Sequence, residues 1–454
     1  MTDNRLDVYM DERFAGSLAR ARDRSVTFEY DEEYADSPDT TPLSLSMPKS
    51  RLVHRDDLAG SWLANLLPDS EKKLERIAAS VGTRSIQPFD LLARIGHDVA
   101  GAVQIFPEGT SPKDDSDHVE RTESHIADEL RSLRTDPDYV PDDFGRWSLA
   151  GQQGKIAIAL NYGKNWADIA SAGQQGKITV APSGERWYTP SGSAASTHIL
   201  KIGPDGMAGG DLAEFVTLRA AHYCSIPAPK AWLHRFDDQL AVVVERYDRY
   251  TDHSRITPEG QSPHVRRIHQ EDMCQALGVR PGLKYQSDGG PSAKEIADAL
   301  WRLPARSREG SVQRFAQLLI FNALTYSPDA HAKNYSVLLQ GSEVTFAPAY
   351  DLMSNAVRLD LKATRHETKL AMKTASSDYE ADRFTPDRLA AFGAELRLPG
   401  DWLVATAQHL TLRIGAAFDI ALDEAEQVLG ASDRIGSMRH HAADLDALLV
   451  KRWA

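Results

Sequence analysis

The sequence has very little cysteine: only Cys224 and Cys274 occur among its 454 residues. Two thiols are too few for a disulfide framework, or for a zinc site with four thiolate ligands. We therefore expect the reducing cytoplasm as the compartment. Long apolar runs are also missing, because stretches such as Leu318–Phe321 are far shorter than the roughly 20 residues that span a membrane. We expect no contact with a membrane.

Positive charge is scarce as well. The 52 Lys and Arg residues face 65 Asp and Glu residues, which gives a formal net charge of −13. This balance argues against broad contact between the chain itself and nucleic acid, since such contact depends on neutralising phosphates. The N-terminal residues are polar and acidic and lack the basic and apolar regions of a secretory signal.

The pattern of apolar and turn-forming residues divides the chain into four parts. Residues 1–107 alternate strand-like and helix-like segments, which predicts a small α+β domain. Residues 108–145 are rich in Pro, Ser, Gly and Asp around one helix, and predict a linker with a helix. Residues 146–250 predict a β-rich lobe, and residues 251–454 a helical one. This order predicts an α+β protein with the two-lobed protein-kinase-like fold: a β-rich N-lobe, an all-helical C-lobe and a small N-terminal subdomain.

Strands in the first part can be placed more closely. Leu6–Met10 and Arg13–Leu18 alternate around Asp11-Glu12 and predict a hairpin. Val26–Tyr30 and Leu43–Met47 predict two further strands.

One sequence repeat stands out. Ala-Gly-Gln-Gln-Gly-Lys-Ile occurs at 150–156 and again at 172–178. Small residues allow backbone N–H groups to approach phosphate oxygens closely. The candidate phosphate loop is therefore Ala150, Gly151, Gln152, Gln153, Gly154 and Lys155, and the alternative loop has Gly173, Gly176 and Lys177. Neither copy is a Walker loop, because Gly and Lys lie too close together, and a hairpin turn is the competing interpretation.

Further residues match the parts that phosphoryl transfer requires. Lys201 ends an apolar strand, where it is a candidate for holding nucleotide phosphates, with Glu214 on the following helix as its partner. Asp329 and Asn334 are five residues apart on a turn from an apolar helix to a strand. Asp351 follows after one hairpin. This spacing allows Asp329 to act as a base, while Asn334 and Asp351 hold Mg²⁺; an Asx-rich turn is the structural alternative.

Beyond these motifs, the chain resembles the HipA-type toxin kinases over nearly its whole length. Ser148–Lys155 is similar to the phosphate loop of the family, and Ser196–Lys201 to its nucleotide-lysine strand. Other phrases that resemble the family are Leu66-Leu-Pro, Gly96–Ala102, Val244–Arg249, Gln270–Ala276 and Lys284–Pro291.

The resemblance implies a serine/threonine protein kinase that uses ATP and Mg²⁺, with Asp329 as the catalytic residue and Asn334 and Asp351 as the metal ligands. It also implies a set of nucleotide contacts. Besides the phosphate loop, this set contains Lys201, Glu245, Arg246, Tyr247, His331, Asn334, Tyr350 and Asp351.

Partners and regulation are implied in the same way. Known targets of the family include aminoacyl-tRNA synthetases, whose phosphorylation would halt translation and growth. A small helix-turn-helix antitoxin of the HipB type is the implied partner, and operator DNA is bound through that antitoxin. Family members phosphorylate their own loop serine, here Ser148, which ejects the loop. The phosphate adds about two negative charges and would repel ATP.

The duplication departs from the family pattern. Ser148 precedes the first copy, whereas the second copy has Ala170 at that place. Yet Lys177 of the second copy lies 24 residues before Lys201, as is usual in the family, and Lys155 lies 46 residues before it. Both copies remain candidates for the ATP loop, and the serine favours the first.

Two alternatives to an active toxin kinase remain. A duplicated loop is compatible with a pseudokinase that acts only as a co-repressor bound to its antitoxin and operator. A small-molecule kinase could use the same two-lobed scaffold, since fold does not determine substrate.

Overall fold

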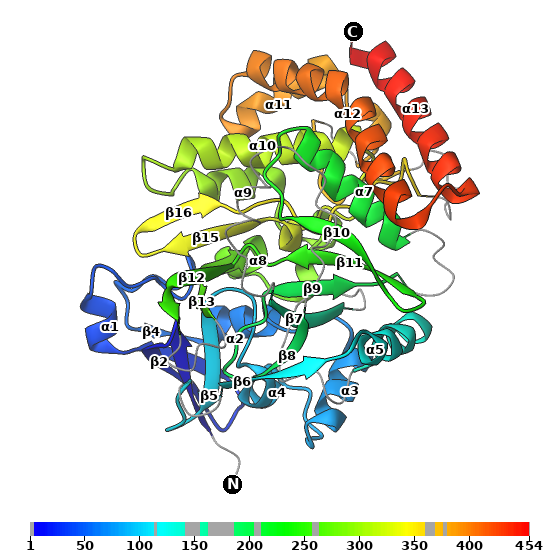
Figure 1. The fold of residues 1–454 in the computed structure, drawn as a ribbon. Coiled ribbons are helices and arrows are strands. Elements are labelled where there is room, and N and C mark those ends of the chain that lie inside the picture. Colours follow the sequence, from blue (N-terminus) through cyan, green and yellow to red (C-terminus); the bar gives the residue numbers. More distant parts are fainter. Residues whose placement is uncertain are drawn as a thin grey trace.

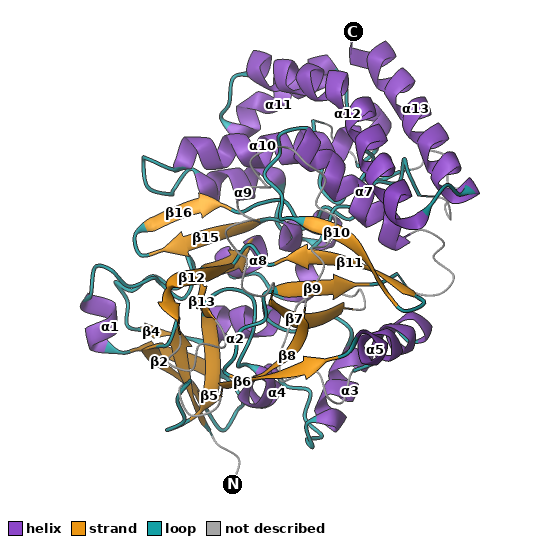
Figure 2. Cartoon of the chain, viewed as in Figure 1, coloured by secondary structure: helices purple, strands orange, loops and turns teal. Residues whose placement is uncertain are grey.

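The computed structural model describes residues 4–112, 116–140, 155–161, 186–203, 210–256, 263–358, 368–375 and 379–453. Figure 1 shows the N-terminal strands at the bottom, a second sheet in the middle and a group of long helices at the top. Figure 2 shows the same separation, with the strands in the lower and middle parts and helices at the top.

The N-terminal domain is built on an antiparallel sheet of order β4-β3-β2-β1-β5. Asp11 and Glu12 form the β1–β2 turn, and both have positive φ angles, as a two-residue hairpin of this kind requires. The strands are β1 (Arg5–Met10), β2 (Arg13–Arg20), β3 (Val26–Tyr30), β4 (Val53–His54) and β5 (Val103–Pro107). The helices are α1 (Glu32–Asp36), α2 (Asp56–Asn65), α3 (Glu71–Ser80) and α4 (Pro88–Ile95).

The strand expected at Leu43–Met47 is not formed. Only an isolated bridge joins Ser44 and Met47. The hydroxyl of Tyr30 accepts a hydrogen bond from the Leu43 N–H at 2.6 Å and donates to the Met47 carbonyl at 2.7 Å. A buried side chain therefore satisfies backbone groups that a neighbouring strand would otherwise pair.

The second sheet forms the N-lobe, with the order β10-β11-β9-β7-β8-β6. Part of the expected linker belongs to it, because β6 pairs with β8 and the apolar face of α5 shares one core with β7, β9, β10 and β11. The strands are β6 (Ser116–Arg121), β7 (Lys155–Asn161), β8 (Arg186–Gly192), β9 (His198–Lys201), β10 (Ala231–Phe236) and β11 (Gln239–Glu245); α5 is Glu123–Thr135.

Helix α7 (Gly210–Tyr223) joins the two lobes. It is buried along almost its whole length, and it shares one core with β10, β11 and the C-terminal helices. Arg219 of α7 forms an ion pair with Glu424 of α12 at 2.7 Å. Because both faces of α7 are covered, the position of Glu214 on this helix is tightly constrained.

The described part of the C-lobe is mainly helical and contains two small sheets, the two-stranded β12-β13 and the three-stranded β14-β15-β16. The hairpin of β15 (Ser336–Gln340) and β16 (Glu343–Phe346) is the one expected between Asn334 and Asp351. The remaining elements are β12 (Arg249–Ile256), β13 (Pro263–Arg267), β14 (His269–Asp272), α8 (Met273–Ala276), α9 (Ala293–Leu300), α10 (Arg308–Leu324), α11 (Pro386–Leu396), α12 (Gly400–Leu429) and α13 (Asp433–Trp453).

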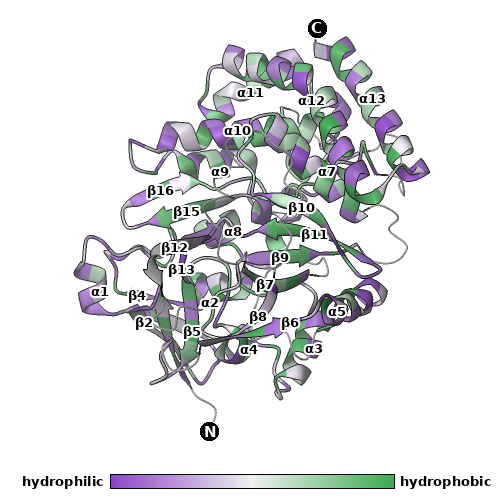
Figure 3. Ribbon diagram, viewed as in Figure 1, coloured by the Kyte–Doolittle hydropathy of each residue, from purple (hydrophilic) through white to green (hydrophobic). Residues whose placement is uncertain are grey.

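The two C-terminal helices are amphipathic. Both α12 and α13 carry hydrophobic and hydrophilic residues, as the mixed colours in Figure 3 show. Leu403, Ala407, Leu410 and Ile414 recur at helical spacing along α12 and are all buried. Among the described helices, none is both long enough and apolar enough to cross a bilayer.

A buried cluster of charges attaches the N-terminal domain to the segment between the lobes, which is Arg246–Arg249 and follows β11. Asp98 accepts hydrogen bonds from Arg249 at 2.7 Å and from the Ser196 N–H at 3.0 Å. Asp248 pairs with Arg246 at 2.8 Å and with Arg249 at 2.9 Å. Such a cluster fixes geometry, because removing any one member would leave an uncompensated buried charge.

A second buried contact between domains centres on Glu271 of β14. Its carboxylate accepts hydrogen bonds from the Ser44 hydroxyl at 2.5 Å and from the Leu45 N–H at 2.7 Å. Burial nevertheless raises the pKa of Glu271 to about 8, because it disfavours the charged form more than the two donors favour it.

This raised pKa predicts a pH-dependent stability. Between pH 4.5 and about 8 the folded chain binds a proton at Glu271 that the unfolded chain does not. Stability contributed by this group is therefore complete at low pH, and is lost as the pH rises, by at most about 1.4 kcal/mol per pH unit. Glu271→Gln removes this loss. The free energy of unfolding of the variant, measured with urea, should therefore rise relative to that of wild type between pH 5 and 8. Glu75→Gln, at an exposed position, is the control, and parallel curves for all three proteins would contradict the assignment.

Candidate active site

Lys201, at the end of β9, is the centre of the candidate site. Its ammonium donates to Asp351 Oδ1 at 2.8 Å and is also bonded to Glu214 of α7. Burial alone would lower the pKa of Lys201, but the two carboxylates outweigh it and raise the pKa. Lys201 in turn holds the pKa of Asp351 well below its usual range. The expected pairing of Lys201 with Glu214 is present, and Asp351 joins it from the other lobe.

Lys155 is the only residue of the candidate phosphate loop within the described ranges. It opens β7 and lies opposite Lys201 in the ladder between β7 and β9. Burial, together with the charge of Lys201, lowers the pKa of Lys155 to about 8. Two lysines side by side at one end of a sheet are suited to an anion with several charges, such as a polyphosphate.

The segment from Asp329 to Asn334, the candidate catalytic loop, forms a compact loop after α10. The Asp329 carbonyl accepts hydrogen bonds from the His331 N–H at 2.9 Å and from the Asn334 side-chain amide at 2.7 Å. The short helix η4 (Ala332–Asn334) completes the turn into β15. The loop is therefore closed by its own polar groups, while the Asp329 side chain remains largely exposed to solvent, at 59%.

Asn334 and Asp351 carry oxygen atoms of the kind that bind a magnesium ion. The side-chain nitrogen of Asn334 is used by the Asp329 carbonyl, so its oxygen is the atom left for a ligand. Asp351 has a left-handed backbone, with φ of 56°, which Asp tolerates better than most residues. Amide and carboxylate oxygens are the ligands that Mg²⁺ prefers. Within the described residues, no group of three or more His, Cys, Asp or Glu side chains is arranged for a metal.

His331 and Tyr350 connect the two halves of the site. His331 is buried, which lowers its pKa, and it interacts electrostatically with both Asp329 and Asp351. The Tyr350 hydroxyl bonds to the Lys333 carbonyl at 2.6 Å, next to Asn334. The structure thus brings together the loop from Asp329 to Asn334, Asp351 and Lys201, which are far apart in the sequence.

The segment Glu245–Tyr247 begins at the end of β11, where the chain passes from the N-lobe towards the C-lobe. The Arg246 side chain, however, belongs to the buried cluster with Asp98 and Asp248. The backbone N–H of Arg246 donates to the Thr197 carbonyl at 2.8 Å. The Arg246 side chain therefore attaches this segment to the N-terminal domain. The Tyr247 ring lies 5.9 Å from the Tyr350 ring.

The other predicted loop residues lie outside the described residues. These are Ser148, Ala150, Gly151, Gln152, Gln153 and Gly154 of the first copy, and Gly173, Gly176 and Lys177 of the second.

Lys333, one residue before Asn334, has none of the roles that the sequence predicts. Its ammonium donates to Asn65 Oδ1 at 2.8 Å, to the Asn65 carbonyl at 3.1 Å and to Asp272 Oδ2 at 3.1 Å. Asn65 ends α2, so the N-terminal domain directly holds the catalytic loop. No local sequence pattern signals this contact, because the two residues are 268 positions apart.

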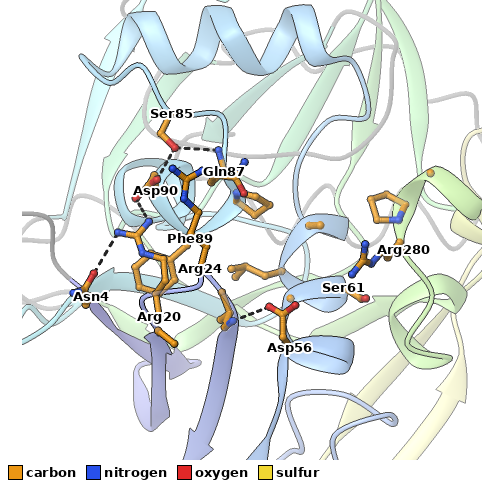
Figure 4. Close-up of a pocket in the computed structure, with 18 of the residues that line it drawn as sticks. Asn4, Arg20, Arg24, Asp56, Ser61, Ser85, Gln87, Phe89, Asp90 and Arg280 are labelled. Carbon is orange, nitrogen blue, oxygen red and sulfur yellow. Dashed lines mark hydrogen bonds and ion pairs between the residues drawn. The ribbon is translucent and has the colours of Figure 1, made fainter.

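A separate pocket of about 950 Å³ lies between the N-terminal domain and the segment Arg280–Leu283. Figure 4 shows Arg20, Phe89 and Asp90 in its wall. The Arg20 guanidinium pairs with Asp90 at 2.5 Å and lies over the Phe89 ring at 4.7 Å. None of the candidate catalytic residues lines this pocket, so it is distinct from the site around Lys201.

The two-lobed fold, the Lys201–Glu214 pair and the loop from Asp329 to Asn334 define a protein kinase. Comparisons with known proteins make the class more specific. The family described as HipA-like C-terminal domain matches residues 147–418, and HipA N-terminal domain matches residues 6–106. The chain therefore belongs to the HipA family of serine/threonine toxin kinases.

Individual relatives agree with this assignment. The chain is 32% identical over 387 residues to "Putative kinase Y4mE" of Sinorhizobium fredii, which covers 84% of both chains. It is 29% identical over 390 residues to "Serine/threonine-protein kinase toxin HipA" of Shewanella oneidensis, covering 83% of this chain and 80% of that one. A solved Shewanella oneidensis complex of HipA, HipB and operator DNA contains a chain of the same fold, with a TM-score of 0.78, 24% identity, and 98% and 97% of the two chains covered.

The contact between Asn65 and Lys333 generates a prediction. Asn65→Ala removes an acceptor from a buried ammonium, which should cost about 1.5–3 kcal/mol of unfolding free energy. It should also slow phosphotransfer, because Lys333 is part of the catalytic loop. Urea unfolding and initial rates measure the two effects. Asn4→Ala, at an exposed position of the same domain, is the control, and a variant as stable and active as wild type would refute the coupling.

Proposed function

We propose that this chain transfers the γ-phosphate of Mg-ATP to a serine or threonine hydroxyl of a protein, with Asp329 as the catalytic base. The observation that carries the proposal is the contact between Lys201 and Asp351 at 2.8 Å. It joins a strand of the N-lobe to a segment that follows the catalytic loop. A nucleotide at this contact would have its phosphates beside two buried lysines and near Asp329.

Each residue of the site then has a separate task. Lys201, oriented by Glu214, holds the phosphates, and Lys155 adds a second positive charge. Asp329 takes the proton of the acceptor hydroxyl. The oxygen of that hydroxyl bonds to the γ-phosphorus, while the bond from that phosphorus to the oxygen bridging to the β-phosphate breaks. Asn334 and Asp351 would hold Mg²⁺, which supplies positive charge for the phosphate oxygens. Glu245, Tyr247, His331 and Tyr350 would contact the rest of the nucleotide, whereas the buried Arg246 side chain would hold their segment in place.

The strand order supports the first copy of the repeat as the ATP loop. Lys155 belongs to that copy and begins β7, which is directly paired with β9 and Lys201. In this arrangement the second copy is part of the connection from β7 to β8, and the sequence distance of 46 residues has no bearing on contact in space. The regulatory Ser148 precedes the same copy, so autophosphorylation control is part of this proposal.

The two copies can be separated by matched substitutions. Gly154→Val should raise the Kd for Mg-ATP by about tenfold or more, because a side chain there would keep the loop backbone away from the phosphates. A tenfold change corresponds to a loss of about 1.4 kcal/mol in the free energy of binding. Gly176→Val, the equivalent change in the second copy, should leave it unchanged. Isothermal titration of both variants measures this, and the reverse pattern would assign the loop to the second copy.

The relatives support a proposal for the biological setting. We infer a HipB-like helix-turn-helix antitoxin as the partner, with operator DNA bound through it, because the solved relative is a complex of that composition. The acceptor would be a translation component such as an aminoacyl-tRNA synthetase. The cytoplasm is the proposed compartment, where the free and buried thiols of Cys224 and Cys274 would stay reduced.

Growth after induced expression without antitoxin is the direct test. Wild type should arrest growth, and Asp329→Ala should not, because loss of a general base slows the reaction by about 10²–10⁴-fold. Transfer of label from γ-labelled ATP to protein in a cell lysate should fall in parallel. Asp401→Ala, at an exposed position on α12, is the control and should behave as wild type.

The opposite outcome has a defined meaning. Normal growth and no label transfer with wild type would favour the pseudokinase co-repressor, which predicts that Asp329→Ala leaves operator repression intact. Transfer to a metabolite instead of a protein would favour a small-molecule kinase.

A further inference from the structure

Among the described residues, the contacts of the Asp329 side chain lie on one side of its carboxylate. In the described part of the chain, its side-chain contacts go to Oδ1: the Tyr285 hydroxyl lies at 2.5 Å and His331 Nε2 at 3.9 Å. An exposed Asp on a loop has several rotamers of similar energy, unless a neighbour selects one. Tyr285 is the residue in position to make that selection.

Tyr285 is itself firmly placed. Its ring lies against the His331 imidazole, with centroids 4.9 Å apart and planes nearly perpendicular, and the Lys284 ammonium is 5.4 Å from its centre. Lys284 forms an ion pair with Asp69 of the N-terminal domain at 2.7 Å, and its carbonyl accepts from the Ala332 N–H at 3.2 Å. The segment that carries Tyr285 is therefore tied both to that domain and to the catalytic loop.

The turn after Tyr285 requires a glycine. The Tyr285 carbonyl accepts hydrogen bonds from the Asp288 N–H at 3.1 Å and the Gly290 N–H at 3.0 Å. A Cβ atom at Gly290 would lie 2.8 Å from that carbonyl oxygen and 1.9 Å from the oxygen of Leu283. This packing explains a glycine in the phrase Lys284–Pro291, whose role the sequence did not reveal.

The hydrogen bond has a defined direction. Burial, assisted by the hydrogen bond to Asp329, raises the pKa of Tyr285 above its ordinary value. The phenol therefore keeps its proton at neutral pH and donates it to the carboxylate. A carboxylate has two oxygens, so a donor on Oδ1 leaves Oδ2 to accept from a substrate hydroxyl.

We propose that Tyr285 is a positioning residue of the phosphotransfer site: its hydroxyl holds Oδ1 of Asp329, so that Oδ2 faces the acceptor hydroxyl. This inference rests on the proposed kinase function. In the transfer step the acceptor proton goes to Oδ2, the acceptor oxygen bonds to the γ-phosphorus, and ADP leaves with the electrons of the broken bond. Tyr285 keeps its own proton throughout.

The test is Tyr285→Phe, which keeps the ring against His331 and removes only the hydroxyl. Transfer from γ-labelled ATP to casein, and to the chain itself, is measured over a range of ATP concentrations. We expect kcat to fall by about tenfold, with the KM for ATP unchanged, because a misplaced base slows only the step in which it acts. A general loss of structure would change both constants and the melting temperature.

Tyr223→Phe is the matched control, because the Tyr223 hydroxyl also donates to a carboxylate, that of Glu424 on α12. It should retain wild-type kcat. An unchanged or increased kcat in Tyr285→Phe would overturn the proposal, an increase meaning that Tyr285 occupies the place of the acceptor. Phosphate on Tyr285 of the wild type, detected by mass spectrometry, would make it an acceptor and would also overturn the proposal.

The two proposals fail in different ways. A wild type that transfers no label, as inactive as Asp329→Ala, contradicts the kinase function. An active wild type matched by an equally active Tyr285→Phe contradicts only the role of Tyr285.

Discussion

The arrangement of the whole site depends on the buried charge of Lys201. An ammonium out of water is costly unless opposite charges surround it, and here Glu214 and Asp351 do so. The three residues come from β9, α7 and the segment after β16, so neutralising one charge sets the relative position of both lobes. The burial of α7 between the sheet and α12 then makes the position of Glu214 difficult to change. The same charges that are expensive to bury are those that a nucleotide with its metal would engage.

The N-terminal domain serves the same purpose from the opposite side. Asp98 neutralises arginines of the segment between the lobes, and Asn65 accepts from Lys333 in the catalytic loop. Asp69 holds Lys284 and, through it, the segment of Tyr285. A domain that contributes no candidate catalytic residue thus supports three separate parts of the site. These contacts are buried or partly buried, where solvent screens an ion pair little. The N-terminal domain therefore helps to orient the residues of the candidate site.

Much of the architecture could be predicted from local patterns. The β1–β2 hairpin, α5, α7, the hairpin β15–β16 and the long C-terminal helices follow from apolar periodicity and turn residues. Errors arose where tertiary contacts override local preference. Leu43–Met47 has the composition of a strand, but the Tyr30 hydroxyl takes its backbone groups. Residues 116–121 lie in a stretch with the composition of a linker, but they complete the edge of a sheet whose other strands come much later in the sequence.

The sequence by itself determined which chemical groups this protein can use. Lys201, Glu214, Asp329, Asn334 and Asp351 are recognisable by type, order and spacing, because phosphoryl transfer requires few groups and they follow one another along the chain. Only the tertiary structure decided which neighbours orient them. Tyr285 and Asp329 are 44 residues apart, and Lys333 and Asn65 are 268 apart; no local pattern encodes such pairs. They form because the fold brings distant segments together, and a buried polar group must then find its partner there.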